Sequence, residues 1–226
     1  MAKSLQDMIT RIGSEIRRPS LGTSPTALTS PIANAIFDAI AIYQKDRFRI
    51  SDIDPDVPPT FTTTQGDEVY SISNNANIGT IFNFDYLNVM VGSTMEKMTR
   101  RTAEEINLLN QQNQQSGQPT DYAYEGNKII LYPIPNATVW TIFLGGHILV
   151  AAPTDLADTT NVWMNWAEQL IRCHAKYEIA IHITRNKEMA AAMSPDVPGE
   201  TWKAWRRLKN ETNKIKSVGR MRAMQW

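Results

Sequence analysis

The chain has little of what secreted, membrane-spanning or disulfide-stabilised proteins need. Its single cysteine, Cys173, excludes an internal disulfide and fits a protein made in a reducing cytoplasm. No stretch of about eighteen apolar residues occurs, and the first residues hold no apolar signal core, so we expect neither membrane spanning nor secretion. With 226 residues, 42% of them hydrophobic, the chain can still bury a substantial core.

Net charge is also absent, because 23 basic and 23 acidic side chains balance. Their distribution is uneven: residues 199–226 carry eight basic and two acidic side chains, which gives this segment a net charge of +6 and the remainder −6. A segment of that sign suits an acidic protein surface or a nucleic-acid backbone as its partner.

A β-hairpin is predicted over residues 119–135. Tyr122 and Tyr124 alternate with small or polar neighbours, and the sequence Glu-Gly-Asn-Lys at 125–128 supplies two residues that tolerate positive φ. The apolar run 129–132 resumes the strand, and two prolines then end it because proline cannot donate to a ladder. The hairpin region contains no nucleophile with a base, no metal-ligand spacing and no phosphate loop.

Two amphipathic helices are predicted near the start of the chain. Ser4 can cap a helix over residues 4–18, in which apolar side chains recur at helical spacing. Ser30 and Pro31 give a stronger start signal for a second helix, which we expect to reach about residue 49 with cations in its last turns. Its apolar stripe should belong to the core.

From residue 51 to about residue 150 the composition is typical of β structure. The apolar face switches within residues 81–91, which predicts a bulge or burial on both sides. One helix is expected at 99–112, and the Gln-rich stretch 111–118 should be a solvated loop, with a recognition surface as the alternative. The expected strands are 60–64, 68–72, 81–91, 122–124, 129–132 and 139–144.

Two more helices are predicted in the C-terminal third. One should run from a cap within residues 158–161 to about residue 186, and its two apolar surfaces require neighbours on two sides. The last should run from Glu200 to about residue 218, with tryptophans on one side and cations on the other. Residues 220–226 hold two arginines, two methionines and a tryptophan, a segment too short to fold alone.

Taken together, these elements predict an α+β protein. Residues 1–50 and 155–226 should form a helical bundle domain with a C-terminal arm, and residues 51–154 should form an inserted β-rich domain.

The order helix, helix, β segment, helix, helix, together with the pattern P-x-x-Y-x-x-x-G-x-x-I-x-L-Y-P-x-P at residues 119–135, resembles the bacteriophage head-to-tail adaptor proteins. These are also called head completion or connector proteins. The similarity extends through the Leu-Ala-Asp turn at 156–158 and the tryptophan-bearing helix after it. The chain departs from the family pattern in its Gln-rich stretch and its basic end.

This resemblance implies a structural virion protein at the head–tail junction, made in the host cytoplasm and acting without catalysis, cofactor, metal or membrane. Copies of such a protein, twelve by resemblance, form a homo-oligomeric ring below the portal protein. The ring extends the channel through which the genomic DNA passes and gives tail nozzle or tail tube proteins a place to dock.

The resemblance further implies three contact surfaces. The candidates for portal binding are Arg206, Arg207, Lys209, Arg220, Met221, Arg222, Met224 and Trp226. The candidates for the subunit interface are Trp163, Trp166, Tyr177, Trp202 and Trp205. The candidates for a tail-facing hairpin surface are Tyr122, Tyr124, Asn127 and Lys128.

Two alternatives from other functional classes remain open. The chain could be a DNA-binding module whose affinity falls steeply with salt and depends on Lys203, Arg206, Arg207 and Lys209. It could also be a metal-dependent hydrolase, because His174, Glu178 and His182 are spaced by four on one helical face, although the usual His-Glu-x-x-His spacing is missing.

Overall fold

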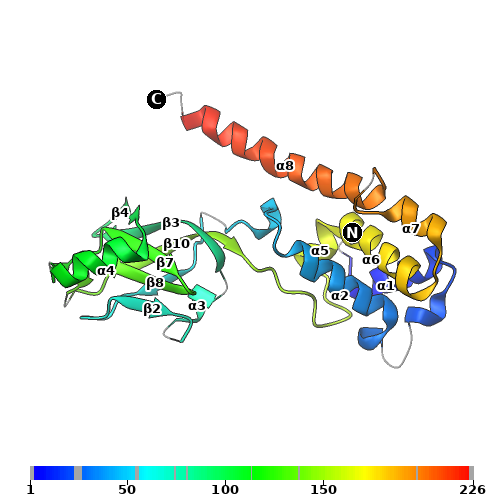
Figure 1. Cartoon of the computed structure of the whole chain (residues 1–226), viewed down its shortest axis with the longest axis horizontal. Coiled ribbons are helices and arrows are strands. Elements are labelled where there is room, and N and C mark those ends of the chain that lie inside the picture. Colours follow the sequence, from blue (N-terminus) through cyan, green and yellow to red (C-terminus); the bar gives the residue numbers. More distant parts are fainter. Residues whose placement is uncertain are drawn as a thin grey trace. The chain divides into compact units, whose positions relative to one another are not determined.

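The structure, a computed structural model, describes residues 3–22, 27–53, 56–73, 75–79, 81–112, 114–136, 138–196 and 198–223, with only the backbone described at 27, 79, 82 and 214–223. The chain divides into two compact units, Met1–Ile50 with Val150–Trp226, and Ser51–Leu149. The first unit is helical and the second consists mainly of strands (Figure 1), which confirms the α+β class.

Local sequence signals start both N-terminal helices. α1 (Leu5–Glu15) begins with a capping box, in which the side chains of Ser4 and Asp7 each accept a hydrogen bond from the other's backbone N–H. α2 (Pro31–Tyr43) begins after the cap residue Ser30, with a proline at its first position. Both predicted starts are confirmed.

α2 ends at Tyr43, so its predicted extension to residue 49 is wrong and the cations expected in its last turns lie beyond it. The chain leaves the helix because Phe48 enters the core, where it is fully buried. The Gln44 side chain also donates to the Val150 carbonyl at 2.8 Å. The short 3-10 turns of this unit are η1 (Pro19–Gly22), η2 (Ala27–Thr29) and η3 (Arg49–Ser51).

The continuous helix predicted up to residue 186 is also wrong. It is divided into α5 (Val162–Asn165), α6 (Glu168–Glu178) and a π-helical turn, η4 (Ile179–Ile183). Between α5 and α6 the backbone at Ala167 leaves helical geometry. Asn165 fixes the end of α5, because its side chain donates to Thr159 O at 2.7 Å and accepts from Lys3 N at 3.0 Å.

The last two helices are α7 (Lys187–Met193) and α8 (Glu200–Ala223). α8 passes the predicted end near residue 218. Gly219 does not stop it because a glycine within a helix costs only about 1 kcal/mol, and the residues that follow are good helix formers.

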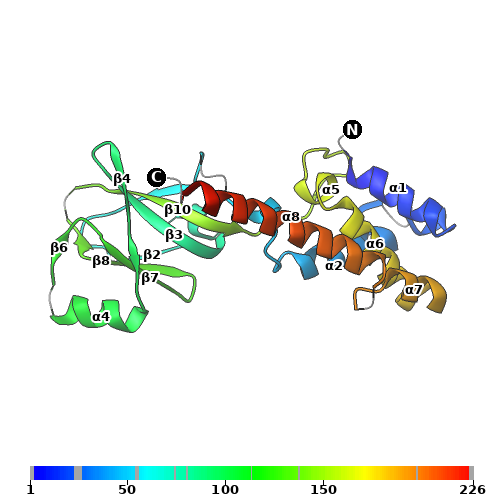
Figure 2. The ribbon, with the colours of Figure 1, turned by 90° about the horizontal axis from the view of Figure 1, so that it is seen from above.

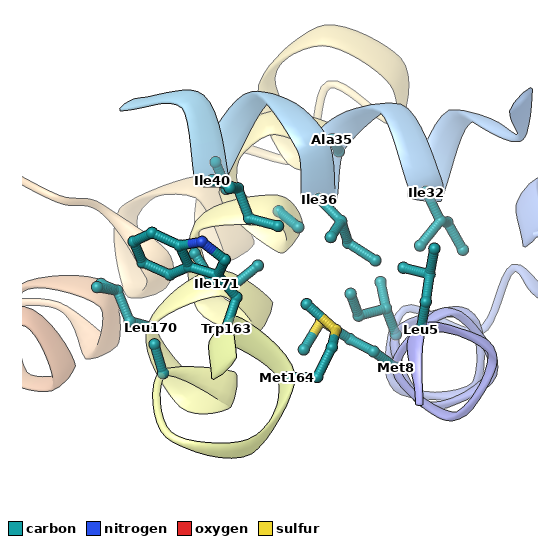
Figure 3. Packing of buried hydrophobic residues seen from close by; sticks show 14 of the residues in the cluster. Leu5, Met8, Ile32, Ala35, Ile36, Ile40, Trp163, Met164, Leu170 and Ile171 are labelled. Carbon is teal, nitrogen blue, oxygen red and sulfur yellow. The ribbon is translucent and has the colours of Figure 1, made fainter. Parts of the chain in front are cut away.

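The apolar faces of α1, α2, α5 and α6 meet in one core (Figure 3). In this view Trp163 lies near Ile40 toward one side of the cluster, and Leu5 lies near Ile32 toward the other. All four are at most 1% exposed, and burying a side chain of this size contributes roughly 1.5–3 kcal/mol. This core positions α5 and α6, and residues of these two helices are among the site candidates described below.

The second unit contains two four-stranded sheets with the orders β1-β10-β3-β4 and β2-β8-β7-β5, and a two-stranded pair β6-β9. The strands of the first sheet are β1 (Thr60–Thr62), β3 (Ile81–Val91), β4 (Thr94–Lys97) and β10 (Thr141–Ile148). The others are β2 (Val69–Ser71), β5 (Thr99–Arg100), β6 (Ser116–Gly117), β7 (Asp121–Glu125), β8 (Lys128–Tyr132) and β9 (Ile134–Pro135). Every residue of β4 is exposed, so the strand has no apolar alternation by which the sequence could have revealed it.

Of the two alternatives predicted for β3, a bulge or burial on both sides, the structure shows a bulge. Gly145 pairs with Tyr86 and Gly146 pairs with Phe84, so Asp85 is the extra residue of the bulged strand. A Cβ atom on Gly146 would overlap the carbonyl oxygen of Asn83. The sequence pair Gly145-Gly146 therefore allows the close approach of β10 to β3.

The helix predicted at 99–112 begins later, because residues 99 and 100 form β5. α4 spans Ala103–Gln112, and a capping box starts it: Glu105 N donates to Thr102 Oγ1 at 3.2 Å, and Thr102 N donates to Glu105 Oε2 at 3.1 Å. Its buried Ile106 packs with residues of β7 and β8, and Figure 2 shows α4 beside the strands of this sheet. A short helix, α3 (Ala76–Gly79), completes the unit.

Candidate functional site

The predicted hairpin forms from β7 and β8 around a two-residue turn. Gly126 and Asn127 both have positive φ, 56° and 61°, as a type I′ turn requires. Asn127 and Lys128 are exposed at the turn, Tyr124 is half-buried and donates to Asn127 Oδ1 at 3.1 Å, and Tyr122 is buried. Of the four residues predicted to face the tail, two therefore present their whole side chains to solvent.

The five aromatic candidates for a subunit interface lie in different environments. Trp163 is 1% exposed and belongs to the core, whereas Trp166, three residues later, is 69% exposed. Tyr177, Trp202 and Trp205 are half-buried. Because the chain changes direction between α5 and α6, the two neighbouring tryptophans do not share one face.

An apolar groove of about 260 Å³ lies beside Trp166. Arg49 N donates to Thr212 Oγ1 at 3.0 Å, and this bond holds the turn after α2 against α8. The residues that line the groove are Phe48, Arg49, Ile50, Trp166, Leu208, Glu211 and Thr212. An exposed tryptophan next to a partly open apolar groove is the kind of surface at which a partner protein docks.

The four cations of α8 whose side chains the structure describes have partners within the chain. Lys203 pairs with Glu200 at 2.9 Å and Arg207 pairs with Glu211 at 3.0 Å. The Lys209 ammonium lies 3.5 Å from an Asp46 carboxylate oxygen and donates to the Arg47 carbonyl, and the Arg206 guanidinium lies 5.0 Å from the centre of the Trp202 ring. Among these four described side chains, less charge is therefore free for DNA phosphates than the sequence indicates.

The remaining candidates for portal binding lie at the end of α8. Arg220, Met221 and Arg222 are in its last turn, where the backbone alone is described, and Met224 and Trp226 lie outside the described residues.

The proposed metal ligands form a hydrogen-bonded row. His174 Nε2 lies 3.2 Å from Glu178 Oε1, and His182 Nε2 lies 3.2 Å from Glu178 Oε2. The other ring nitrogen of His174 is 2.9 Å from the Tyr43 hydroxyl. Among the described residues, no group of three or more His, Cys, Asp or Glu side chains is arranged to hold a metal ion. Glu178 instead bridges the two imidazoles.

The only cysteine shows no sign of a reactive site. Cys173 is buried in α6, and burial raises the pKa of its thiol. A buried thiol with a raised pKa carries little thiolate at neutral pH, which fits a packing role.

The model of one protein family, described as SU10 adaptor protein, matches residues 3–210 and so spans parts of both units. The chain belongs to this family, which makes it a phage adaptor-type protein, a component of the virion that interacts with other phage head and tail proteins. No curated protein matches the chain. Within the described ranges, no helix is both long enough and apolar enough to cross a membrane.

Proposed function

We propose that the protein is a head-to-tail adaptor that assembles as a ring below the portal, extends the DNA channel and provides a docking place for tail proteins. The observation that carries this proposal is Trp166, which is 69% exposed beside an apolar groove in a chain of an adaptor family. Leaving so large an apolar side chain in water is unfavourable, and a neighbouring subunit would cover it. A closed ring, of twelve copies by resemblance, needs such contacts to be heterologous.

In this proposal the helical unit and the β-rich unit make different contacts. A helical bundle of residues 1–50 and 155–226 supplies the contacts to neighbouring copies and to the portal, and the β-rich insertion of residues 51–154 faces the tail. Trp166, with Trp202 and Trp205, forms the subunit interface. Asn127 and Lys128, exposed at the hairpin turn, point to tail docking.

Portal binding is assigned to the exposed arginines of α8 and to the end of this helix. Arg206 and Arg207 are exposed and can exchange their present partners for acidic groups of the portal. Lys209 is more firmly engaged within its own unit, so its part in this contact is smaller. The residues of the arm are Arg220, Met221, Arg222, Met224 and Trp226.

The experiment is the molar mass of the purified protein by light scattering, alone and mixed with the phage portal protein. We expect one large, defined complex with the portal, and deletion of Arg220–Trp226 should abolish this complex while the far-UV circular dichroism stays close to that of the full chain. A small species that ignores the portal, and instead binds duplex DNA with steep salt dependence, would replace the adaptor proposal with the DNA-binding one.

A further inference from the structure

A second hollow in the helical unit differs in chemistry from the groove beside Trp166. This cleft has a volume of about 510 Å³, and its lining residues are Ile42, Tyr43, His174, Pro195, Asp196, Trp202 and Trp205. Two tryptophans and a tyrosine form much of the wall, and the only carboxylate among the lining residues is Asp196. We call it the aromatic cleft.

Two residues that follow Asp196 in the sequence have close contacts with the end of α7. A Cβ atom on Gly199 would lie 2.8 Å from the Ser194 carbonyl and 2.9 Å from the Ala192 carbonyl, so only glycine fits there without a shift of the backbone. The fully buried Thr201 donates to the carbonyl of Met193, which ties the start of α8 to the end of α7. The Asp196 backbone N–H donates to Ser194 Oγ at 3.2 Å, which holds this lining residue of the cleft beside the end of α7.

The charge that faces the cleft is negative. Within the described part of the chain, the exposed Asp196 carboxylate has no ion pair. Burial raises the pKa of Tyr43, and the nearby negative charges of Asp46, Asp196 and Glu178 raise it further. Asp46 and Glu178 already have partners, in Lys209 and the two imidazoles.

The cations nearest to the cleft do not line it. The Arg206 guanidinium lies 5.0 Å from the Trp202 ring centre, and the Lys209 ammonium lies 5.6 Å from that of Trp205, yet neither residue is among those that line the cleft. The Trp205 ring is fixed because its Nε1–H donates to Asp46 Oδ2 at 2.7 Å. Aromatic surface and an unpaired carboxylate are thus presented together, which is the combination that attracts an organic cation.

We propose that the aromatic cleft is a docking site for an arginine side chain of a partner protein. The cation would lie against Trp202 and Trp205 and pair with Asp196, while the apolar stem of the same side chain would cover Ile42, which is 50% exposed. Trp202 and Trp205 also belong to the proposed subunit interface, so this inference rests on the proposed function, and the partner is a neighbouring copy of the chain. The binding itself can be measured on the free protein without ring or portal.

The test is a titration of the full chain with N-acetyl-arginine methylamide, followed by the indole N–H signals of Trp202 and Trp205 in NMR spectra. N-acetyl-citrulline methylamide, which has nearly the same shape but no charge, is the matched control. We expect saturable shifts with the arginine compound and at least about tenfold weaker binding of the citrulline compound. Asp196→Asn should remove that difference, whereas Glu188→Gln, a change of an exposed carboxylate outside the cleft, should preserve it.

Equal responses to the two compounds, or an unchanged preference for arginine in the Asp196→Asn variant, would overturn the assignment. Either result would leave assembly on the portal untouched, because that is read by light scattering. If the arginine compound binds as expected but no portal complex forms, the cleft stands and the adaptor proposal fails.

Discussion

Tyr43 and His174 form a buried hydrogen bond, with 2.9 Å between the tyrosine hydroxyl and His174 Nδ1. The two rings meet edge to face with their centres 5.2 Å apart, and the contact joins α2 to α6 across a sequence separation of 131 residues. Glu178 approaches the other ring nitrogen at 3.2 Å. This arrangement keeps an imidazole within the core and makes the stability of the helical unit depend on pH.

The first prediction concerns that pH dependence. Burial lowers the pKa of His174, although the charge and hydrogen bond of Glu178 oppose the shift. The folded state therefore binds fewer protons than the unfolded state near neutral pH. The stability associated with the neutral ring is present above the unfolded pKa of about 6.5 and is lost as the pH falls from there toward the lowered folded value.

We therefore expect the melting temperature, measured by circular dichroism, to fall between about pH 7 and about pH 5. His174→Gln should flatten this profile, and His182→Gln should keep it because that side chain is 69% exposed. Identical slopes for the His174→Gln variant and the unmodified protein would contradict the assignment.

The second prediction tests the hairpin turn. Gly126 has a φ of 56°, and a residue with a Cβ atom in left-handed geometry costs roughly 1–2 kcal/mol, so Gly126→Ala should lower the free energy of unfolding by that amount. Gly117→Ala is the control, because a Cβ atom there meets no atom within 4 Å and its φ is not positive. Urea unfolding should show a clear loss for the first variant only, and similar losses for both would argue against the turn.

The third prediction separates the two neighbouring tryptophans. Trp163→Ala removes a side chain that is 1% exposed and should cost about 3–5 kcal/mol in the free energy of unfolding. Trp166→Ala removes one that is 69% exposed, so its stability should stay within about 0.5 kcal/mol while assembly with the portal weakens. Full assembly by the Trp166→Ala variant would remove this residue from the proposed interface.

The fourth prediction concerns the ion pairs between α1 and α6. Glu15 lies against Arg172 and 2.9 Å from Lys176, whose side chain is only 11% exposed. Burial by itself would raise the pKa of the Glu15 carboxyl, but the hydrogen bond and charge of Lys176, with the charge of Arg172, lower it below its usual value. This contribution to stability is present above the ordinary Glu pKa and lost as the pH falls through the lowered value.

Glu15→Gln should accordingly destabilise the protein by about 2 kcal/mol at pH 7, because Lys176 loses a charged partner. Glu211→Gln is the control, since the pair of Glu211 with Arg207 is exposed and should contribute little. If the two substitutions lower the free energy of unfolding equally in chemical denaturation, the ion pairs between α1 and α6 contribute no more stability than an exposed pair.

Short-range signals predicted several elements of this fold correctly. The capping serines at 4 and 30, the turn at 126–127 and the switch of apolar face in β3 each involve residues within a few positions of one another. The sequence pattern of Thr102 and Glu105 would also have placed the start of α4, and it was missed. Adaptor family membership likewise agrees with the resemblance carried by the hairpin motif.

Other features depend on contacts between distant segments. The end of α2 depends on the burial of Phe48 and on the bond from Gln44 to Val150, and the break after α5 depends on the bond from Lys3 to Asn165. No local pattern encodes these contacts.

The sequence alone thus determined the type of most elements, because capping, turn geometry and apolar periodicity act within a few residues. The class of protein was indicated by the resemblance of the element order and the hairpin motif to a known family. Only the tertiary structure decided that Trp163 is buried while Trp166 is exposed, and that Asp196 joins two tryptophans at one cleft. These outcomes follow from how the helices pack, and packing brings together side chains whose spacing along the chain carries no signal.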